Sequence, residues 1–451
     1  MLKNIRNIYT SVFFIGIFLL VVFNRPFVGL SILGYRIGEL LILFGLLLTP
    51  LPLVLKIFKT QLIDKEYDVL LKLFYGILAL FFISVLVNDS NILSSYTFKS
   101  SSYIWTLPYL LVGFVFFNFK DSDEKFRMIF LSIFMFAPIV HYLFSTGYFP
   151  NFIIDFFNEF SDKFEFTKAS DIMITLLIAN ILCFKFLKNT FIKMCYFFFS
   201  VSFMLPLLLL MSRGSFVSTV LFFITVVFYY RKYFVKNLKN SIIFMFIGGV
   251  SFVLSTYNVN DIDFSFNLGG GAIAENDLSV VENVKTISKK NNTRKAFLSL
   301  YIEDGRLMSI DNTTNWRLDI WQDVFVDMNS KNLIIKGYGH NSIIPVMTDP
   351  SAPGRLGRDG LNENVHNYFV NIFARGGAFQ LFAYLAFYIT LLNIWKKKYG
   401  DYSILIFIIP ILFNSTLDMS MEGVQYPITF FSFLGYLFAT EGSSKTINFD
   451  V

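Results

Sequence analysis

The sequence predicts an all-α integral membrane protein with about twelve transmembrane helices and one large, partly helical extracytoplasmic loop. Long apolar runs recur along the chain, and most approach the roughly 20 residues that a helix needs to cross a bilayer. The composition agrees, because 55% of the residues are hydrophobic and 16% are charged, whereas soluble domains average about 25% charged residues. Lysine and arginine also concentrate in alternate loops, which is typical of a chain that crosses a membrane repeatedly.

The apolar runs define the predicted spans. In chain order these are Tyr9–Phe23, Ile37–Ile57, Val69–Val87, Tyr103–Phe119, Phe126–Phe144, Asp171–Leu187, Phe191–Met211, Ser215–Tyr230, Ile242–Tyr257, Tyr368–Ile394, Tyr402–Leu417 and Val424–Ala439. By the positive-inside rule, the basic loops and both termini are cytoplasmic. The net charge of +6 therefore reflects loops that set orientation, and it does not indicate a nucleic-acid partner.

This pattern divides the chain into four parts. Residues 1–257 hold about nine N-terminal spans, and residues 258–365 form the large extracytoplasmic loop. Residues 366–440 hold about three C-terminal spans, and residues 441–451 form a cytoplasmic tail.

The large loop contains one segment with helical periodicity. Apolar residues recur at helical spacing from Trp316 to Met328, which predicts an amphipathic helix with Thr314 or Asn315 as its N-cap. The end of the loop, residues 345–364, is rich in proline and glycine and is predicted to be mobile.

Arg213 stands in a short turn between two predicted spans. One interpretation is an arginine that reaches the lipid headgroups with its charged end. The other is a clamp for phosphate at the membrane surface, because the planar guanidinium binds phosphate through two parallel hydrogen bonds. Ionisable residues at membrane depth are costly and usually functional.

Arg317 falls in the predicted first turn of the loop helix, one turn before Trp321. It either stacks on that tryptophan or provides a second contact for an anion. Cations are disfavoured near helix N-termini, so an acidic partner or substrate is expected beside it. Arg294, Arg306, Arg355 and Arg358 are further loop cations that are candidates for the same role.

His366 directly precedes a predicted span and is the candidate general base, because histidine exchanges protons near neutral pH. His340 is a second candidate, although it also suits a turn. Glu363 and Asn367 flank His366 and are additional candidates. No spacing typical of a metal site occurs, so no metal is expected.

Together these residues form an ordered set of motifs. The set comprises Ser212-Arg213-Gly214, Arg317-x-x-x-Trp321, Gly337-x-Gly339 and His366-Asn367 followed by Gly376-Gly377. In order and spacing, and with a single large outer loop, it resembles the O-antigen ligase and polymerase superfamily over roughly residues 200–395. Arg375 departs from the pattern, since members of the family often carry an acidic residue there.

The resemblance implies a glycosyltransferase that uses a glycan linked to undecaprenyl diphosphate, without a metal or another cofactor. His366 would take the proton of the acceptor hydroxyl, and Arg213 and Arg317 would bind the diphosphate. It also implies a bacterial inner membrane protein whose active site faces the periplasm. Its partners would be lipid-linked oligosaccharides as donor and acceptor, membrane lipids and a chain-length regulator, with no nucleic acid.

Three functions follow as hypotheses. An O-antigen or capsule repeat-unit polymerase would transfer the growing glycan to the next lipid-linked repeat unit. An O-antigen ligase would transfer it to lipid A-core, and the motifs do not separate the two. A transporter or flippase for lipid-linked glycans would need charged residues along a path through several spans, and the spans here carry few.

Overall fold

The protein is predominantly helical. The computed structural model describes residues 2–53, 67–118, 124–163, 168–260, 299–352, 354–356 and 362–439. The helices are α1 (Leu2–Gly29), α2 (Ile37–Leu48), α4 (Asp68–Val87), α5 (Ser95–Ser100), α6 (Ser102–Trp105), α7 (Tyr109–Asn118), α8 (Glu124–Ser145), α9 (Asn151–Phe160), α10 (Ala169–Phe186), α11 (Thr190–Met211), α12 (Arg213–Tyr229), α13 (Arg231–Lys236), α14 (Leu238–Asn260), α16 (Asn312–Ser330), α17 (Tyr368–Tyr399), α18 (Leu405–Leu417), α19 (Gln425–Ala439) and the short 3-10 helix η2 (Pro345–Thr348). The hairpins β1–β2 (Ser31–Ile32, Tyr35–Arg36) and β3–β4 (Leu300–Glu303, Arg306–Ser309) are antiparallel. These two short hairpins qualify the all-α prediction.

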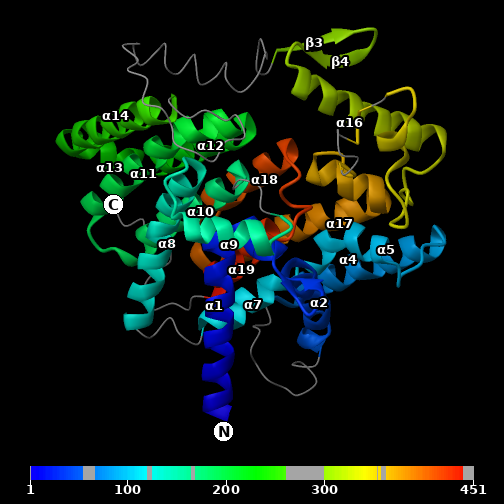
Figure 1. Cartoon of the computed structure of the whole chain (residues 1–451), viewed down its shortest axis with the longest axis horizontal. Coiled ribbons are helices and arrows are strands. Elements are labelled where there is room, and N and C mark those ends of the chain that lie inside the picture. The colour runs from blue at the N-terminus through cyan, green and yellow to red at the C-terminus, as the bar shows by residue number, and fades with distance from the viewer. Residues whose placement is uncertain are drawn as a thin grey trace.

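The core of the helical part is built around α10. Every residue of this helix from Ala169 to Phe184 is buried, as expected for a helix that is apolar on all sides and enclosed by others. It packs against α8, α11, α12 and α19, while α7 packs on α19, α11 on α14 and α4 on α17. Helices α11, α12 and α14 gather at one end of the molecule, and α4, α16 and α17 at the other (Figure 1).

Each predicted span overlaps a helix within the described residues. Among the described residues, five helices, α4, α10, α11, α14 and α17, are long and apolar enough to cross a membrane, and five shorter apolar helices accompany them. The protein is therefore membrane-embedded in character. The run Ile37–Ile57 is interrupted by a turn at Thr49 and Pro50. The run Tyr103–Phe119 is broken into α6 and α7 by the turn before Tyr109. Pro108 explains the break, because it has no N–H and its ring clashes with the preceding helical turn.

The described part of the large loop has its own small hydrophobic core. Ile320, Val324 and Met328 of α16 are fully buried there against Phe373 and Ala374 at the start of α17. The predicted periodicity of α16 is thereby confirmed for its buried face. Figure 1 shows α16 and the β3–β4 hairpin beyond the end of α17, outside the main group of helices. The loop core holds α16 at a defined place above α17.

Helix α16 begins earlier than predicted. Asp311 is its N-cap and accepts a hydrogen bond of 2.9 Å from the amide of Thr314, so the prediction of Thr314 or Asn315 as N-cap was wrong. Arg317 consequently lies in the second turn and not in the first. The electrostatic penalty for a cation at a helix N-terminus falls off within the first turn. The position of Arg317 must therefore be explained by its tertiary neighbours.

Glycine allows the loop to run directly along α17. The amides of Tyr338 and Ala378 donate hydrogen bonds of 2.7 and 2.8 Å to the carbonyls of Ala374 and Ile334. A Cβ on Gly377, whose φ is +74°, would lie 1.9 Å from the carbonyl oxygen of Ile335. Only glycine fits this backbone contact, and the bend that Gly377 introduces in α17 makes room for it.

Candidate functional site

His366 is held from several sides at the junction between the loop and α17. Its φ of 54° is in the left-handed region, which few non-glycine residues adopt. The ring packs edge-on against Trp316 with 5.0 Å between centroids, and its Nε2 lies 2.5 Å from Asn362 Oδ1. The indole N–H of Trp321 donates a hydrogen bond of 2.7 Å to the carbonyl of Val365, the residue before His366. The backbone and the ring are therefore both fixed in direction.

Charged groups from three distant segments act on this ring. Burial, followed by the cation of Arg317, lowers the pKa of His366 to about 4. Asp418, directly after α18, opposes this shift, and Lys168, directly before α10, adds to it. The imidazole is therefore neutral at neutral pH, the form in which it can accept a proton.

The hydrogen bonds of Asn362 determine which ring nitrogen of His366 carries the proton. The Asn362 amide nitrogen donates to the carbonyl of Arg355 at 3.0 Å, so its oxygen is the acceptor that faces His366. Nε2 of the neutral ring must then be the protonated nitrogen. Nδ1 is buried and has no hydrogen-bond partner among the described residues. Its lone pair is available to a proton donor that enters the site.

Arg213 is the first residue of α12 and forms an ion pair with Asp311, with 3.7 Å between Nη1 and Oδ1. Both side chains are almost completely buried. Because Asp311 is the N-cap of α16, this ion pair links a membrane helix to the start of the loop helix. Arg317 follows on the same helix, roughly 9 Å further along its axis. Of the two arginines predicted to bind diphosphate, Arg213 thus contacts the N-cap of α16, and Arg317 belongs to the second turn of the same helix.

Two acidic residues, Asp418 and Glu422, lie in the short connection between α18 and α19. Burial raises the pKa of Glu422 to about 8, and Asp418 raises it as well, while Lys168 lowers it. Both carboxylate oxygens of Glu422 are buried, and no other described residue donates a hydrogen bond to them. Glu422 is therefore protonated at neutral pH. Asp418 is the acid that can balance a positive charge on His366.

His340 occupies a different environment from His366. It is fully buried, its Nε2 lies 3.1 Å from the Tyr103 hydroxyl, and its ring packs edge-on against Phe81. Burial, helped by the cation of Arg375, lowers its pKa to about 3. Ser100 donates to its carbonyl at 2.7 Å. The structure makes His340 a packed residue between the loop and the membrane helices.

Arg375 stands at the position where members of the O-antigen ligase and polymerase superfamily often carry an acidic residue. In this protein it binds the large loop. Its guanidinium donates to the carbonyls of Gly339 and Ser342, at 3.4 and 2.5 Å, and to the Tyr96 hydroxyl at 3.2 Å. The side chain is almost completely buried. The departure from the family pattern therefore has a structural use, because the arginine fastens residues 339–342 onto α17.

The remaining predicted residues make other contacts. Asn367 is the N-cap of α17 and accepts hydrogen bonds from two backbone amides. Glu363 forms an ion pair of 3.0 Å with Lys99 of α5. Arg306 binds Asp319 and Asp323 of α16, at 2.8 and 2.7 Å. Arg294 and Arg358 lie outside the residues that the structure describes.

Reasoning from the sequence missed Lys168, Asp418 and Asn362 as neighbours of His366. For Asp418 a signal was present, because an acid between two closely spaced apolar helices is costly and is therefore often functional. Lys168 and Asn362 carry no comparable signal, since each is one polar residue in a polar stretch. Their proximity to His366 depends on how the helices pack.

The assembled site joins a neutral histidine to cations and an acid. The charges of Arg317 and Lys168 act on the His366 ring, and Nδ1 can accept a proton from a hydroxyl placed next to it. Among the described residues, no three histidine, cysteine, aspartate or glutamate side chains are grouped so that they could hold a metal ion. The arrangement suits the transfer of a group away from a phosphate-containing leaving group.

Comparison with known proteins identifies one family. Residues 196–385 match the model of the O-antigen ligase family, and this segment contains Arg213, Arg317 and His366. Searches of the curated proteins and of the solved structures gave no match. The matched segment begins in α11 and ends in α17, so it includes the large loop and both membrane helices that carry its ends. Residues 196–385 are thus similar to the O-antigen ligase family, and this similarity supports the O-antigen polymerase and ligase superfamily for that part of the chain.

Proposed function

We propose that this protein transfers a glycan from undecaprenyl diphosphate to a sugar hydroxyl at the outer surface of the bacterial inner membrane. The observation that carries the proposal is the buried His366 at the start of α17, whose Nδ1 has no hydrogen-bond partner among the described residues and whose pKa is lowered by burial and by the charges of Arg317 and Lys168. A lipid diphosphate is anionic at the membrane surface, where these groups would meet it. Both termini would then be cytoplasmic, with the site facing the periplasm.

The proposed reaction uses each group in turn. The acceptor hydroxyl attacks the anomeric carbon of the donor sugar as the bond from that carbon to the diphosphate oxygen breaks. His366 Nδ1 takes the proton of the hydroxyl, while Arg317 and Lys168 stabilise the charge that develops on the departing diphosphate. Asp418 and the Asn362 oxygen stabilise the imidazolium that forms. Protein residues would thus supply the positive charge that the leaving group needs.

The roles of the two predicted phosphate-binding arginines differ in this scheme. Arg317 acts on the ring of His366 and is the proposed diphosphate contact. Arg213 remains a predicted second contact, and its ion pair with Asp311 supports a role in setting where α16 begins. The position of Arg317 depends on that start, so Arg213 would influence binding through either role.

We propose further that the acceptor is the next lipid-linked repeat unit, which makes the protein a polymerase of O-antigen or capsule repeats. A chain-length regulator would then be its protein partner. The second candidate is the ligase that transfers to lipid A-core, and it is favoured by the description of the matched family. The two reactions share the donor and differ in the acceptor alone.

The surface polysaccharide of a deletion strain should decide between these reactions. Without a polymerase, we expect the ladder of long chains to disappear while lipopolysaccharide with a single repeat remains, and the wild-type gene should restore the ladder. Loss of all capped forms, with lipid-linked polymer accumulating, would identify a ligase. Retention of single lipid-linked repeats on the cytoplasmic face would identify a transporter and contradict the proposed function.

The low pKa of His366 predicts two different acid limits for the reaction. In the free protein the ring is neutral above pH about 4, so kcat/KM for the donor should stay level down to that pH and fall below it. A bound diphosphate offsets the cations that lower this pKa, so kcat should begin to fall at a higher pH than kcat/KM. Initial rates between pH 3.5 and 8, roughly the range in which histidine titrates, test this. Coincident limits near pH 6.5, the usual histidine pKa, would contradict it.

A further inference from the structure

Asn362 is the only described residue that forms a hydrogen bond with the His366 ring, and it is itself held by two backbone contacts. Its amide N–H donates to the carbonyl of Leu356 at 2.8 Å, and its side-chain nitrogen donates to the carbonyl of Arg355 at 3.0 Å. The orientation of the Asn362 side chain is therefore set by residues 355 and 356.

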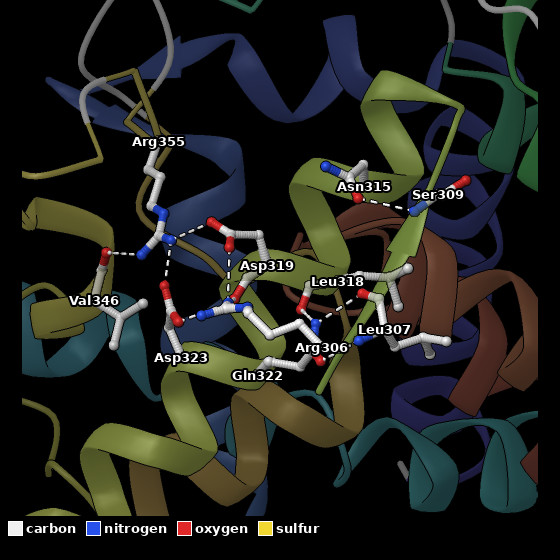
Figure 2. A network of polar contacts seen from close by, with 10 residues as sticks. All are labelled: Arg306, Leu307, Ser309, Asn315, Leu318, Asp319, Gln322, Asp323, Val346 and Arg355. Atoms are coloured by element: carbon white, nitrogen blue, oxygen red, sulfur yellow. Dashed lines mark hydrogen bonds and ion pairs between the residues drawn. The ribbon is translucent and has the colours of Figure 1, made fainter. Parts of the chain in front are cut away.

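Those two residues are in turn fastened to α16 by the side chain of Arg355. The guanidinium is almost completely buried and donates to the carboxylates of Asp319 and Asp323 and, at 3.0 Å, to the carbonyl of Val346. Figure 2 shows Arg355 between the two aspartates, with Arg306 from β4 meeting them from the other side. The segment before His366 is thus tied to the helix that carries Arg317.

The charges explain why this attachment is firm. Asp319 and Asp323 are four residues apart on one face of α16, where like charges repel unless a cation lies between them. Burial by itself lowers the pKa of Arg355, but the hydrogen bonds that it donates to Asp323 and Asp319, together with their negative charges, outweigh burial and raise the pKa. The arginine therefore stays charged, and losing both aspartates would leave its buried charge without compensation.

We propose that Asn362 is a positioning residue that keeps the proton of neutral His366 on Nε2, and that Arg355 with Asp319 and Asp323 holds Asn362 in place. The imidazole then presents Nδ1, unprotonated, to the acceptor hydroxyl. The proposal rests on the proposed function for its catalytic consequence. Its structural content, the position of one proton, does not depend on that function.

The tautomer of His366 can be measured directly, because the chain contains only three histidines. Nitrogen chemical shifts of protein labelled with ¹⁵N-histidine, in detergent or nanodiscs, distinguish a protonated Nε2 from a protonated Nδ1. We expect His366 in the wild-type protein to carry its proton on Nε2. In Asn362→Ala we expect a mixture of tautomers, while the signals of His141 and His340 stay unchanged.

Asn362→Asp should change the pKa of His366 and not its tautomer. A carboxylate keeps the acceptor and adds a negative charge, so it should raise the pKa of His366 above its value of about 4. The acid limit of kcat/KM should then move to higher pH with activity retained at neutral pH. Asn362→Ala should instead lower kcat by about 10- to 100-fold, in the range found when residues that orient a histidine are removed.

The attachment through Arg355 is tested with a matched control. Asp319→Asn with Asp323→Asn weakens the hold on Arg355 and should reproduce the mixed tautomer of Asn362→Ala. Combining these changes with Asn362→Ala should add little, because they act on one chain of contacts. Arg306→Ala removes a cation from the same two carboxylates without touching the segment before His366, and its His366 spectrum should resemble that of the wild type.

The outcomes separate this inference from the proposed function. A single Nε2-protonated state of His366 that persists in folded Asn362→Ala would overturn the positioning role. Equal effects of Arg306→Ala and the double aspartate variant would overturn the attachment through Arg355. If the tautomer responds as expected but no transfer activity exists in the wild-type protein, the positioning stands and the proposed function fails.

Discussion

Replacing His366 with alanine should lower the rate of glycan transfer by about 100- to 10,000-fold, the usual contribution of a general base. Its Nδ1, which has no hydrogen-bond partner among the described residues, is the proposed proton acceptor, and alanine provides no substitute. The expected phenotype is loss of the polysaccharide ladder in a complemented deletion strain, with the protein present in the membrane at wild-type amounts. In vitro, kcat should fall while the KM for the donor changes little, because the cations remain.

Two further variants show that this loss is chemical and not structural. The left-handed backbone at His366 strains alanine, whereas asparagine tolerates it, so His366→Asn should fold normally and remain equally inactive. His340→Ala removes the other histidine of the loop, which is packed against Phe81 and Tyr103. It should reduce the amount of folded protein but not the rate per folded molecule. Full activity of His366→Asn would remove His366 from the mechanism.

Replacing Arg317 with alanine should lower kcat by about 100- to 1,000-fold, as found when one group that stabilises developing negative charge is removed. The donor KM should rise as well, because the same cation would bind the ground-state diphosphate. A second effect has a definite sign: Arg317 lowers the pKa of His366, so its loss raises that pKa. The acid limit of kcat/KM should therefore move to higher pH.

The control for this variant comes from the same helix. Lys331 follows the last turn of α16, is mostly exposed and forms an ion pair of 2.9 Å with Asp327. Lys331→Ala removes one positive charge from the loop and should change neither kcat nor the acid limit. Arg317→Lys should recover part of the rate, because it keeps the charge but not the planar guanidinium. An unchanged acid limit in Arg317→Ala would show that Arg317 does not act on His366.

The start of α16 illustrates what local sequence leaves undecided. Residues 311–315 read Asp-Asn-Thr-Thr-Asn, and each of these residue types is a favourable N-cap. Periodicity predicted the buried face of the helix but placed its first turn about one turn too late. The buried ion pair between Asp311 and Arg213 joins the actual cap to α12, about 100 residues earlier in the chain. That contact is invisible to any local pattern.

The glycine motifs illustrate the reverse case. Gly337 and Gly377 were part of a pattern that suggested a family without showing why glycine is needed. In the structure a Cβ on Gly337 would lie 2.4 Å from the carbonyl oxygen of Arg375, and one on Gly377 would meet Ile335. The two glycines thus serve one purpose, the direct contact of the loop backbone with α17. The two glycines could be noticed in the sequence, but the reason that glycine is needed at both positions is the backbone contact seen in the fold.

The sequence alone determined the apolar helices, the amphipathic face of α16 and the place of His366 at the start of α17. These features depend on hydropathy and on spacing within one turn or one helix, so they can be read locally. Only the tertiary structure decided that His340 is packed in the interior, and that the charges of Arg317, Lys168 and Asp418 shift the pKa of His366. It also brings the Asn362 side-chain oxygen within hydrogen-bond distance of the His366 ring. Charges and hydrogen bonds act through space over a few ångströms, and the packing of α10, α16, α17 and α18 brings together groups that lie far apart along the chain.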